Sequence, residues 1–295
     1  MNRKIDYKIN ENDTGKTVEG FLKEHGYTHQ VLVRLKQTDH GILRNGIWTY
    51  TNERLCKDDL ITVQIVENEC SDNIAPVNLP LDIAYEDDDI IVINKPFDMP
   101  AHPSAGNHDN TLANALMYYY GSQNKPFVYR CINRLDKDTT GLTIVAKHAL
   151  AGGILGNAVA KRAIHRTYYA VCSGCTPICM RISAPIARKD ASTIERCVDF
   201  KHGEYAVTDF IRIKYNPDNN LSLVKLRLLT GRTHQIRVHM KYIGFPLIGD
   251  FLYNPDYTYI SRQALHSGRL VFTHPVTGQK MNLISDIPSD MKSLF

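Results

Sequence analysis

The chain has 295 residues and a net charge of +4, and this length suits more than one domain. It contains no run of eighteen apolar residues, and residues 1–6 lack the apolar core of an export signal. Its seven cysteines show no even, closely spaced pattern, which fits a reducing compartment better than a disulfide scaffold. We therefore expect a cytoplasmic protein, and we expect neither a membrane span nor a disulfide framework.

Residues 1–66 predict a small α+β domain. Residues 17–26 read as a short amphipathic helix that ends at a glycine. The dipeptide Asn45-Gly46 between two apolar runs is a strong hairpin signal, and residues 60–66 have the composition of a strand. Residues 67–80 are polar, contain two prolines and lack periodicity, so they predict a linker.

Residues 81–295 predict a second domain in which strands outnumber helices. The expected strands are residues 89–95, 142–147, 167–173, 207–215, 221–229 and 268–273, and the expected helices are residues 111–120, 148–164 and 233–243. The two kinds of element do not alternate regularly. This order favours an α+β fold, with a mixed, mainly antiparallel sheet and flanking helices, over a doubly wound fold.

Positive charge is concentrated in two segments of the second domain. Residues 129–170 contain seven Lys or Arg and two acidic residues, and residues 225–245 contain five and none. Such a distribution indicates a polyanionic partner, with nucleic acid the leading choice. Two solvated helix faces would produce the same pattern and are the alternative.

The most informative segment is residues 133–142, which place Asp136 between Arg134 and Lys137. Nearby positive charge favours the ionised form of a carboxylate, and an ionised carboxylate suits a nucleophile better than a general acid. The alternative is a surface turn with a local ion pair, because structural ion pairs are common.

Several segments in this order resemble the RluA/RluD type of RNA pseudouridine synthase. The resemblance covers residues 81–290, and its two specific motifs are residues 133–142 and residues 230–240. Weaker support comes from residues 85–96, 99–104, 165–171, 264–267 and 272–275. Residues 1–66 look like the small RNA-binding domain named after the ribosomal S-four protein.

The resemblance implies that specific uridines in structured RNA are isomerised to pseudouridine. Large-subunit ribosomal RNA is the leading target, and transfer RNA is the alternative. On the matching positions, Asp136 would be the nucleophile, Arg237 its guanidinium partner, and Tyr168 the aromatic side chain packed against the target base. Attack on the sugar and attack on the ring both remain open. The reaction needs no metal and no cofactor, and we expect a monomer.

Four further residues are expected to bind the substrate. Arg134 is a candidate to fill the space left when the target base leaves its stack, because a guanidinium plane can replace a base. Arg166 and Arg232 are candidates for RNA contacts, and Lys95, which precedes Pro96, either contacts phosphate or simply ends a strand. The chain departs from the family pattern at Asn133, where most members have His, and at Arg166, where Lys is usual, which bears on the identity of the substrate.

Other classes of function also fit parts of the sequence. Residues 136–139 match the DxDxT pattern of haloacid-dehalogenase-type phosphatases, which use Mg²⁺, although the preceding residues are too polar and basic for the strand that normally leads into it. An RNA-binding protein with a silent isomerase site is the other alternative. Cys172, Cys175 and Cys179 have an incomplete zinc-like spacing. His234 and His239 are five residues apart rather than the four expected of a zinc pair.

Overall fold

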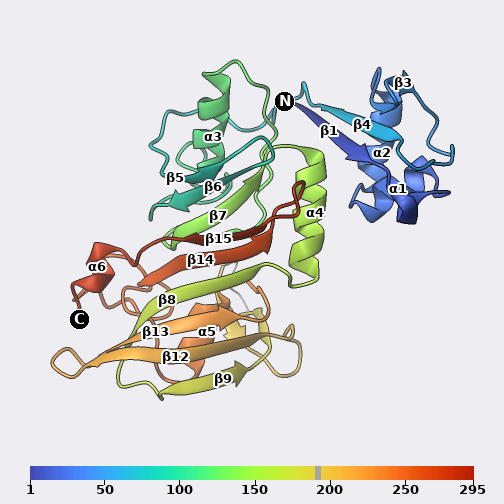
Figure 1. Cartoon of the computed structure of the whole chain (residues 1–295). Helices are drawn as coiled ribbons and strands as arrows, with labels where there is room; N and C mark the ends of the chain where they lie inside the picture. The colour runs from blue at the N-terminus through green and yellow to red at the C-terminus, as the bar shows by residue number, and fades with distance from the viewer. Residues whose placement is uncertain (190–193) are drawn as a thin grey trace.

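The computed structural model describes residues 1–189 and 194–295, which form two main sheets (Figure 1). The smaller sheet has the strand order β1-β4-β2-β3. Its elements are β1 (Asn2–Lys8), a short 3-10 turn (Glu11–Asp13), α1 (Val18–Glu24), α2 (His29–Gln37), β2 (Ile42–Arg44), β3 (Ile47–Trp48) and β4 (Leu60–Val66). All of these elements lie within residues 1–66, and residues 67–80 form neither a helix nor a strand.

The predicted hairpin is confirmed as β2 and β3. Asn45 and Gly46 have φ angles of 53° and 81°, the left-handed pair that a two-residue hairpin turn requires. Helix α2 was not predicted, although Thr28 accepts the N–H of Val31 as an N-cap, as Thr17 does for α1. Its buried residues Val31, Leu32 and Leu35 have helical spacing, so the sequence contained a signal for this helix that the prediction did not use.

The larger sheet has the order β5-β6-β7-β14-β8-β13-β12-β9, with β15 also paired to β14. The strands are β5 (Ile83–Glu86), β6 (Ile90–Lys95), β7 (Thr140–Ala146), β8 (His165–Ser173), β9 (Cys179–Ser183), β12 (Val207–Asn216), β13 (Leu221–Leu228), β14 (Leu265–Thr273) and β15 (Lys280–Ile284). A separate pair is formed by β10 (Ile186–Arg188) and β11 (Arg196–Val198). The β7–β14 pair is parallel and the other pairs of this sheet in the described residues are antiparallel, which confirms the predicted mixed, mainly antiparallel sheet.

Four helices accompany this sheet in the described residues: α3 (Leu112–Gly121), α4 (Ala149–Ala160), α5 (Gln235–Tyr242) and α6 (Ser289–Lys292). The first three match the predicted helices: α3 is shifted by one residue, and α4 and α5 are shorter than predicted. Residue 111 is not helical, because the Thr111 side chain caps α3 in a capping box with Asn114. None of the described helices has the length and apolar character needed to cross a membrane.

Alternate residues of β6 and β7 pack against different helices. Ile90 and Val92 share a cluster with Leu155 of α4, whereas Ile91 and Ile93 share one with Leu116 of α3. Successive side chains of a strand point to opposite faces, so both faces of this part of the sheet are covered. Figure 1 shows α3 and α4 on either side of these strands. This rigid centre carries the loop that contains Asp136.

The N-terminal unit is attached mainly to α4. Leu150 of α4 belongs to the same apolar cluster as the core of residues 1–66. Glu67 lies below that core, where it accepts the N–H of Ala149 at 2.8 Å and pairs with Arg130 at 2.9 Å. A carboxylate at the N-terminus of a helix is favourable, because the first backbone N–H groups have no partner within the helix.

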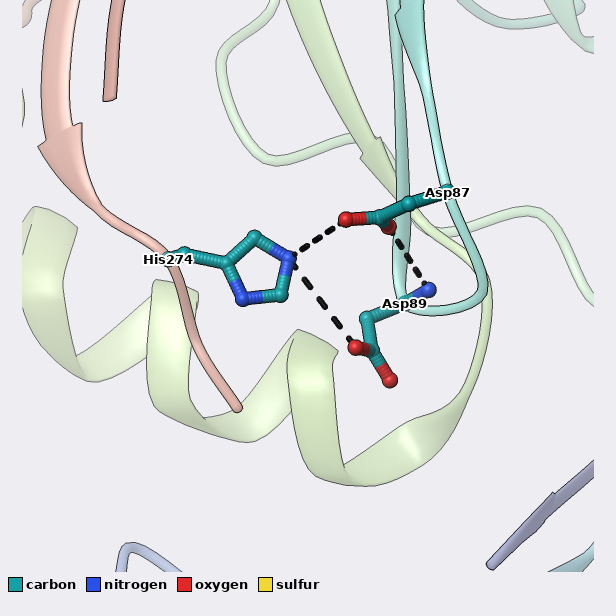
Figure 2. Close-up of side chains that lie close together, drawn as sticks. All are labelled: Asp87, Asp89 and His274. Atoms are coloured by element: carbon teal, nitrogen blue, oxygen red, sulfur yellow. Dashed lines mark hydrogen bonds and ion pairs between the residues drawn. The ribbon is translucent and has the colours of Figure 1, made fainter. Parts of the chain in front are cut away.

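A group of charged side chains, which we call the Asp89 clasp, joins four segments of the chain. It consists of Asp87, Asp89, His274, His148 and Arg3. Figure 2 shows its first three members, with His274 Nε2 2.8 Å from Asp87 Oδ2. Asp89 Oδ1 lies 2.7 Å from Arg3 Nε and 2.9 Å from His148 Nε2. The clasp therefore connects β1, the β5–β6 turn, the start of α4 and the segment after β14.

The clasp has the spacing of a metal site but the bonding of a structural one. Ligand atoms of Asp87, Asp89 and His274 lie within 4.8 Å of one another. However, His274 Nδ1 lies 3.0 Å from the backbone N of Thr277 and accepts its proton, so Nε2 carries the ring proton and cannot ligate a metal. The carboxylate oxygens already accept hydrogen bonds or ion pairs, including one from Tyr85 at 2.7 Å to Asp87.

Replacement of Asp89 with Asn should destabilise the protein by about 3 kcal/mol at pH 7, because Arg3 loses its charged partner and the buried Nε2–H of His148 loses a charged acceptor. Burial alone would raise the pKa of Asp89, but hydrogen bonds from His148 and Arg3 hold that pKa below its usual value. The carboxylate therefore stabilises the fold above about pH 4, and this contribution is lost as the pH falls further.

Urea unfolding of the wild type and of Asp89→Asn between pH 3 and 7 measures both effects. Asp88→Asn is the matched control, because the neighbouring Asp88 side chain is 79% exposed. Equal stability of the two variants at pH 7 would contradict the assigned role of the clasp.

Candidate active site

Asp136 lies in the turn that leads into β7, with 29% of its side chain exposed. The turn is closed by the N–H of Thr139, which donates to the carbonyl of Asp136 at 3.1 Å. Gly141 follows with φ of +105°, and a Cβ there would overlap the backbone of Ser267 in the neighbouring strand. The glycine of the 133–142 motif is thus required where β7 and β14 come together in parallel.

Asn133 braces the other side of the turn. Its Oδ1 accepts the N–H of Ile144 at 2.8 Å, its Nδ2 donates to the carbonyl of Leu142, and its own carbonyl accepts the hydroxyl of Thr143. The side chain is 3% exposed. The departure from the family's usual His at this position is therefore accommodated inside the fold, away from the surface that meets solvent.

Arg237 of α5 is the cation next to Asp136. Its Nη1 donates to Asp136 Oδ2 at 2.9 Å, although the two residues are 101 positions apart. The Arg237 side chain is only 1% exposed. The structure therefore brings together the two residues that the sequence assigned as nucleophile and guanidinium partner.

Asp250 fixes the orientation of Arg237 and was not found from the sequence. Its two carboxylate oxygens accept Nε and Nη2 of Arg237, each at 2.7 Å. The guanidinium also lies near the rings of Phe251 and Tyr253, 5.3 Å and 5.0 Å from their centroids. A bidentate pair with aromatic neighbours holds Arg in one orientation. In the sequence, Asp250 is a single carboxylate among apolar and aromatic residues, and such a pattern indicates no particular function.

These charges set the ionisation of Asp136. Burial alone would raise the pKa of Asp136, but the positive charges of His234, when it is protonated, and of Arg237 lower that pKa below its usual value. His234 Nε2 lies 3.9 Å from Asp136 Oδ2. Burial lowers the pKa of His234 below its usual value. At neutral pH His234 is therefore largely uncharged, and Arg237 is the permanent cation that keeps Asp136 ionised.

The sequence neighbours of Asp136 do not supply this charge. Lys137 pairs with Asp98 at 2.8 Å, and its side chain is 43% exposed. Arg134 is exposed and lines the cavity rather than bonding to Asp136. The expectation that the two flanking cations hold the carboxylate ionised is therefore corrected, since the hydrogen-bonded partner comes from α5.

A cavity above Asp136 gathers six of the seven predicted site residues: Arg134, Asp136, Arg166, Tyr168, Arg232 and Arg237. Tyr168 of β8 forms part of its wall and is 4% exposed. Burial raises the pKa of Tyr168, so its hydroxyl stays protonated at neutral pH. The phenol ring therefore offers a neutral aromatic surface next to an ionised carboxylate.

Two of the predicted RNA-binding arginines meet at Gly231. A Cβ at this glycine would lie 2.9 Å from Arg166 Nη2, so the glycine leaves room for that guanidinium. Arg232 is already partly engaged, because it pairs with Glu204 and its Nε donates to the carbonyl of Tyr205 at 3.1 Å. Both line the cavity, and the charge of Arg166 has no carboxylate partner in the described part of the chain.

Lys95 is the exception, and its prediction as an RNA contact is corrected. The side chain is buried, and Nζ donates to the carbonyls of Pro96, Met99 and Lys137 at 2.7 to 2.9 Å. All three ammonium protons are thereby used inside the protein. Burial lowers the pKa of Lys95 to about 7, while the charge of Asp136 opposes this shift. Lys95 supports the Asp136 turn from below.

The other candidate sites do not assemble. Cys172 is buried, whereas Cys175 and Cys179 are exposed, and the described residues contain no metal-like cluster of these cysteines. Both ring nitrogens of His239 are engaged, by Thr208 at 2.9 Å and by the carbonyl of Ala184 at 2.8 Å. The DxDxT motif of the phosphatases normally follows a strand, but residues 129–135 form no regular strand before Asp136.

Replacement of Lys95 with Met should destabilise the protein by about 3 kcal/mol, because three carbonyls in the interior lose their donor. Replacement of Lys137 with Met is the control and should cost less than about 1 kcal/mol, because its ion pair is exposed. Urea unfolding at pH 7 measures both values. A loss for Lys95→Met no larger than that for Lys137→Met would contradict the supporting role.

Comparison with known proteins identifies relatives along the whole chain. The family described as RNA pseudouridylate synthase matches residues 89–242. The chain is 37% identical over 280 residues to the uncharacterized RNA pseudouridine synthase YjbO of Bacillus subtilis (strain 168), covering 95% of this chain and 98% of that protein. It is 40% identical to ribosomal large subunit pseudouridine synthase D of Haemophilus influenzae, covering 86% and 81%.

A solved structure agrees with these relatives. Human RNA pseudouridylate synthase domain containing 1 superposes with a TM-score of 0.59 and 26% identity, covering 70% of this chain and 83% of that one. The match at residues 89–242 spans Asp136, Tyr168 and Arg237. On these grounds the chain belongs to the RNA pseudouridylate synthase family.

Proposed function

We propose that the protein isomerises specific uridines in the RNA of the large ribosomal subunit, with Asp136 as the nucleophile. The observation that carries the proposal is the Asp136–Arg237 pair in a cavity with an aromatic wall. The choice of target RNA is supported by relatives named as ribosomal large subunit pseudouridine synthases at about 40% identity.

The proposed chemistry uses three groups in the cavity. Once the target uridine has left its stack, its base packs on Tyr168 and lies beside the Asp136 carboxylate. Asp136 forms a bond to the sugar or to the ring, and the bond between the sugar and the ring nitrogen breaks. The base rotates and rejoins the sugar through carbon five, and the bond to Asp136 breaks, which restores the free carboxylate. The proton of carbon five leaves and the ring nitrogen gains one, so the product is an isomer.

Arg237 has an electrostatic role in this scheme. It is held by Asp250 before substrate arrives, so it keeps the carboxylate ionised and aimed without reorganising during the reaction. Arg134, exposed at the rim, is placed to occupy the space that the flipped base leaves. The scheme uses no redox step and no hydrolysis, so we propose that no metal or cofactor takes part.

The proposal extends to the organisation of the protein. Residues 1–66 form an RNA-binding domain, residues 67–80 a linker and residues 81–295 the catalytic domain. The protein works as a monomer in the cytoplasm, where its RNA substrate is found.

Replacement of Asp136 with Asn should abolish pseudouridine formation and leave RNA affinity within a few fold, because the amide keeps the shape of the carboxylate but is not a nucleophile. Chemical mapping of pseudouridine in transcribed large-subunit RNA measures the first effect, and filter binding measures the second. Asp138→Asn is the matched control and should retain activity within several fold. Activity of Asp136→Asn near that of the control would refute the assignment.

Replacement of Asp250 with Asn should lower kcat by about 100-fold with little change in KM, because Arg237 loses one of its two charged anchors and shifts from its position beside Asp136. Steady-state kinetics on the same RNA measure the split between the two constants. Asp256→Asn, which alters an exposed carboxylate in the same region, should leave both constants unchanged. A normal kcat for Asp250→Asn would contradict the role of Asp250 in positioning Arg237.

The target uridine can be found by mapping pseudouridine across all RNA from a strain that lacks the protein. A site missing from large-subunit RNA is the expected result, and a site missing only from transfer RNA would redirect the proposal.

A further inference from the structure

The cavity at Asp136 is small and opens onto a larger basic surface. Its volume is about 80 Å³, which suits one base rather than a length of RNA. A neighbouring hollow shares Arg166, Leu228, Gly231 and Arg232 with it. This hollow extends past the end of α4, where four basic side chains line it: Arg162, His165, Arg166 and Arg227. We call these four residues the basic shelf.

The basic shelf has positive charge that the fold does not use. Arg162 and Arg227 are exposed, and neither makes an ion pair or side-chain hydrogen bond within residues 1–189 and 194–295. Arg227 lies opposite Asp209 in the β12–β13 ladder, and its charge helps to lower the pKa of Asp209, but the hydrogen bonds of Asp209 go to Arg181. Exposed arginines without a bonded carboxylate, beside a cavity, attract a polyanion such as the phosphate backbone of RNA.

Arg162 also occupies a backbone position that disfavours it. It follows the end of α4 with φ of +59°. The N–H of the next residue, Ala163, returns to the carbonyl of Ala158, as in the helix termination that normally places glycine at this point. An arginine here carries a conformational cost that glycine would avoid, and such strain is often found at functional positions.

The basic shelf continues into a groove between α2 and α4. Val159 lines both, so the two hollows meet at the end of α4. The groove is much larger than the cavity, about 1060 Å³, and it has room for several nucleotides. The α2 side presents polar and basic residues, namely His29, Gln30, Arg34 and Gln37. On the α4 side, Gly156 is exposed, and a Cβ there would meet nothing within 4 Å.

We propose that RNA flanking the target uridine leaves the Asp136 cavity across the basic shelf and enters the groove between α2 and α4. This inference rests on the proposed function, and it assigns the flanking strand to a defined path. Phosphates bind Arg162 and Arg227, and the strand then passes between the N-terminal unit and α4. The N-terminal unit, which packs against α4, thereby contacts the same RNA molecule that is modified in the cavity.

Arg162→Gly and Arg227→Gln test the shelf. A fluorescein-labelled 20-nucleotide oligouridine should bind each variant several-fold more weakly in low salt. The slope of log affinity against log salt should decrease by about 0.7 for each lost phosphate contact with single-stranded RNA. Arg162→Gly should at the same time raise the melting temperature, because glycine tolerates the left-handed backbone. If Arg162→Gly binds RNA more weakly but melts at a higher temperature, the variant has lost an RNA contact and has not lost its fold.

Gly156→Phe tests the groove, since Gly156 is exposed, lines the groove and has room for a Cβ. The melting temperature should not fall, and affinity for the 20-nucleotide oligouridine should decrease several-fold. Lys125→Gln removes a charge from an exposed position beyond α3 and is the control for general electrostatics. The path is refuted if the shelf and groove variants bind like the wild type, or if Lys125→Gln loses as much affinity as Arg227→Gln.

Steady-state kinetics on transcribed large-subunit RNA distinguish a failure of the proposed RNA path from a failure of the proposed function. The shelf and groove variants should raise KM and leave kcat unchanged, because the chemistry in the cavity is intact. If the wild type isomerises this RNA but the variants have normal KM and normal binding, the path fails and the function stands. If the wild type isomerises no uridine, the proposed function fails, while oligouridine binding still decides the path.

Discussion

The site depends on one buried guanidinium that is shared by two carboxylates. Arg237 binds Asp250 through two hydrogen bonds and Asp136 through one, and it is almost completely removed from water. A buried cation is costly unless its partners are present, so each carboxylate also stabilises the fold. The result is a carboxylate whose charge and direction are fixed before any RNA arrives.

The elements that support this pair come from distant parts of the chain. Lys95 fills the space below the Asp136 turn, Asn133 braces it against β7, and Gly141 allows β14 to approach. None of these side chains is placed to react. Together they hold the turn so that one oxygen of Asp136 faces Arg237 and the carboxylate remains accessible from the cavity. The position of the Asp136 carboxylate is therefore set by these neighbouring residues rather than by Asp136 itself.

Sequence reasoning succeeded where chemistry and position in the chain coincide. The motifs of residues 133–142 and 230–240 led to Asp136 and Arg237, and the Asn45-Gly46 turn led to the hairpin. It failed where a role depends on burial. Lys95 was expected to bind RNA because lysines usually face water, and Lys137 was expected to act on Asp136 because it is adjacent in sequence. Asp250 could not be found, since an isolated carboxylate in a loop has no periodic or spacing signal.

The order of strands has a consequence for how the protein becomes active during its synthesis. β14 lies between β7 and β8, so it joins the part of the sheet that carries Asp136 to the part that carries Tyr168. Yet β14 begins at residue 265, close to the end of the chain. The residues that precede β14 must therefore all be synthesised before the two halves of the site can be fixed against each other. Pairing between segments so far apart in sequence is slow to form, and an incomplete chain has no assembled site with which to modify RNA.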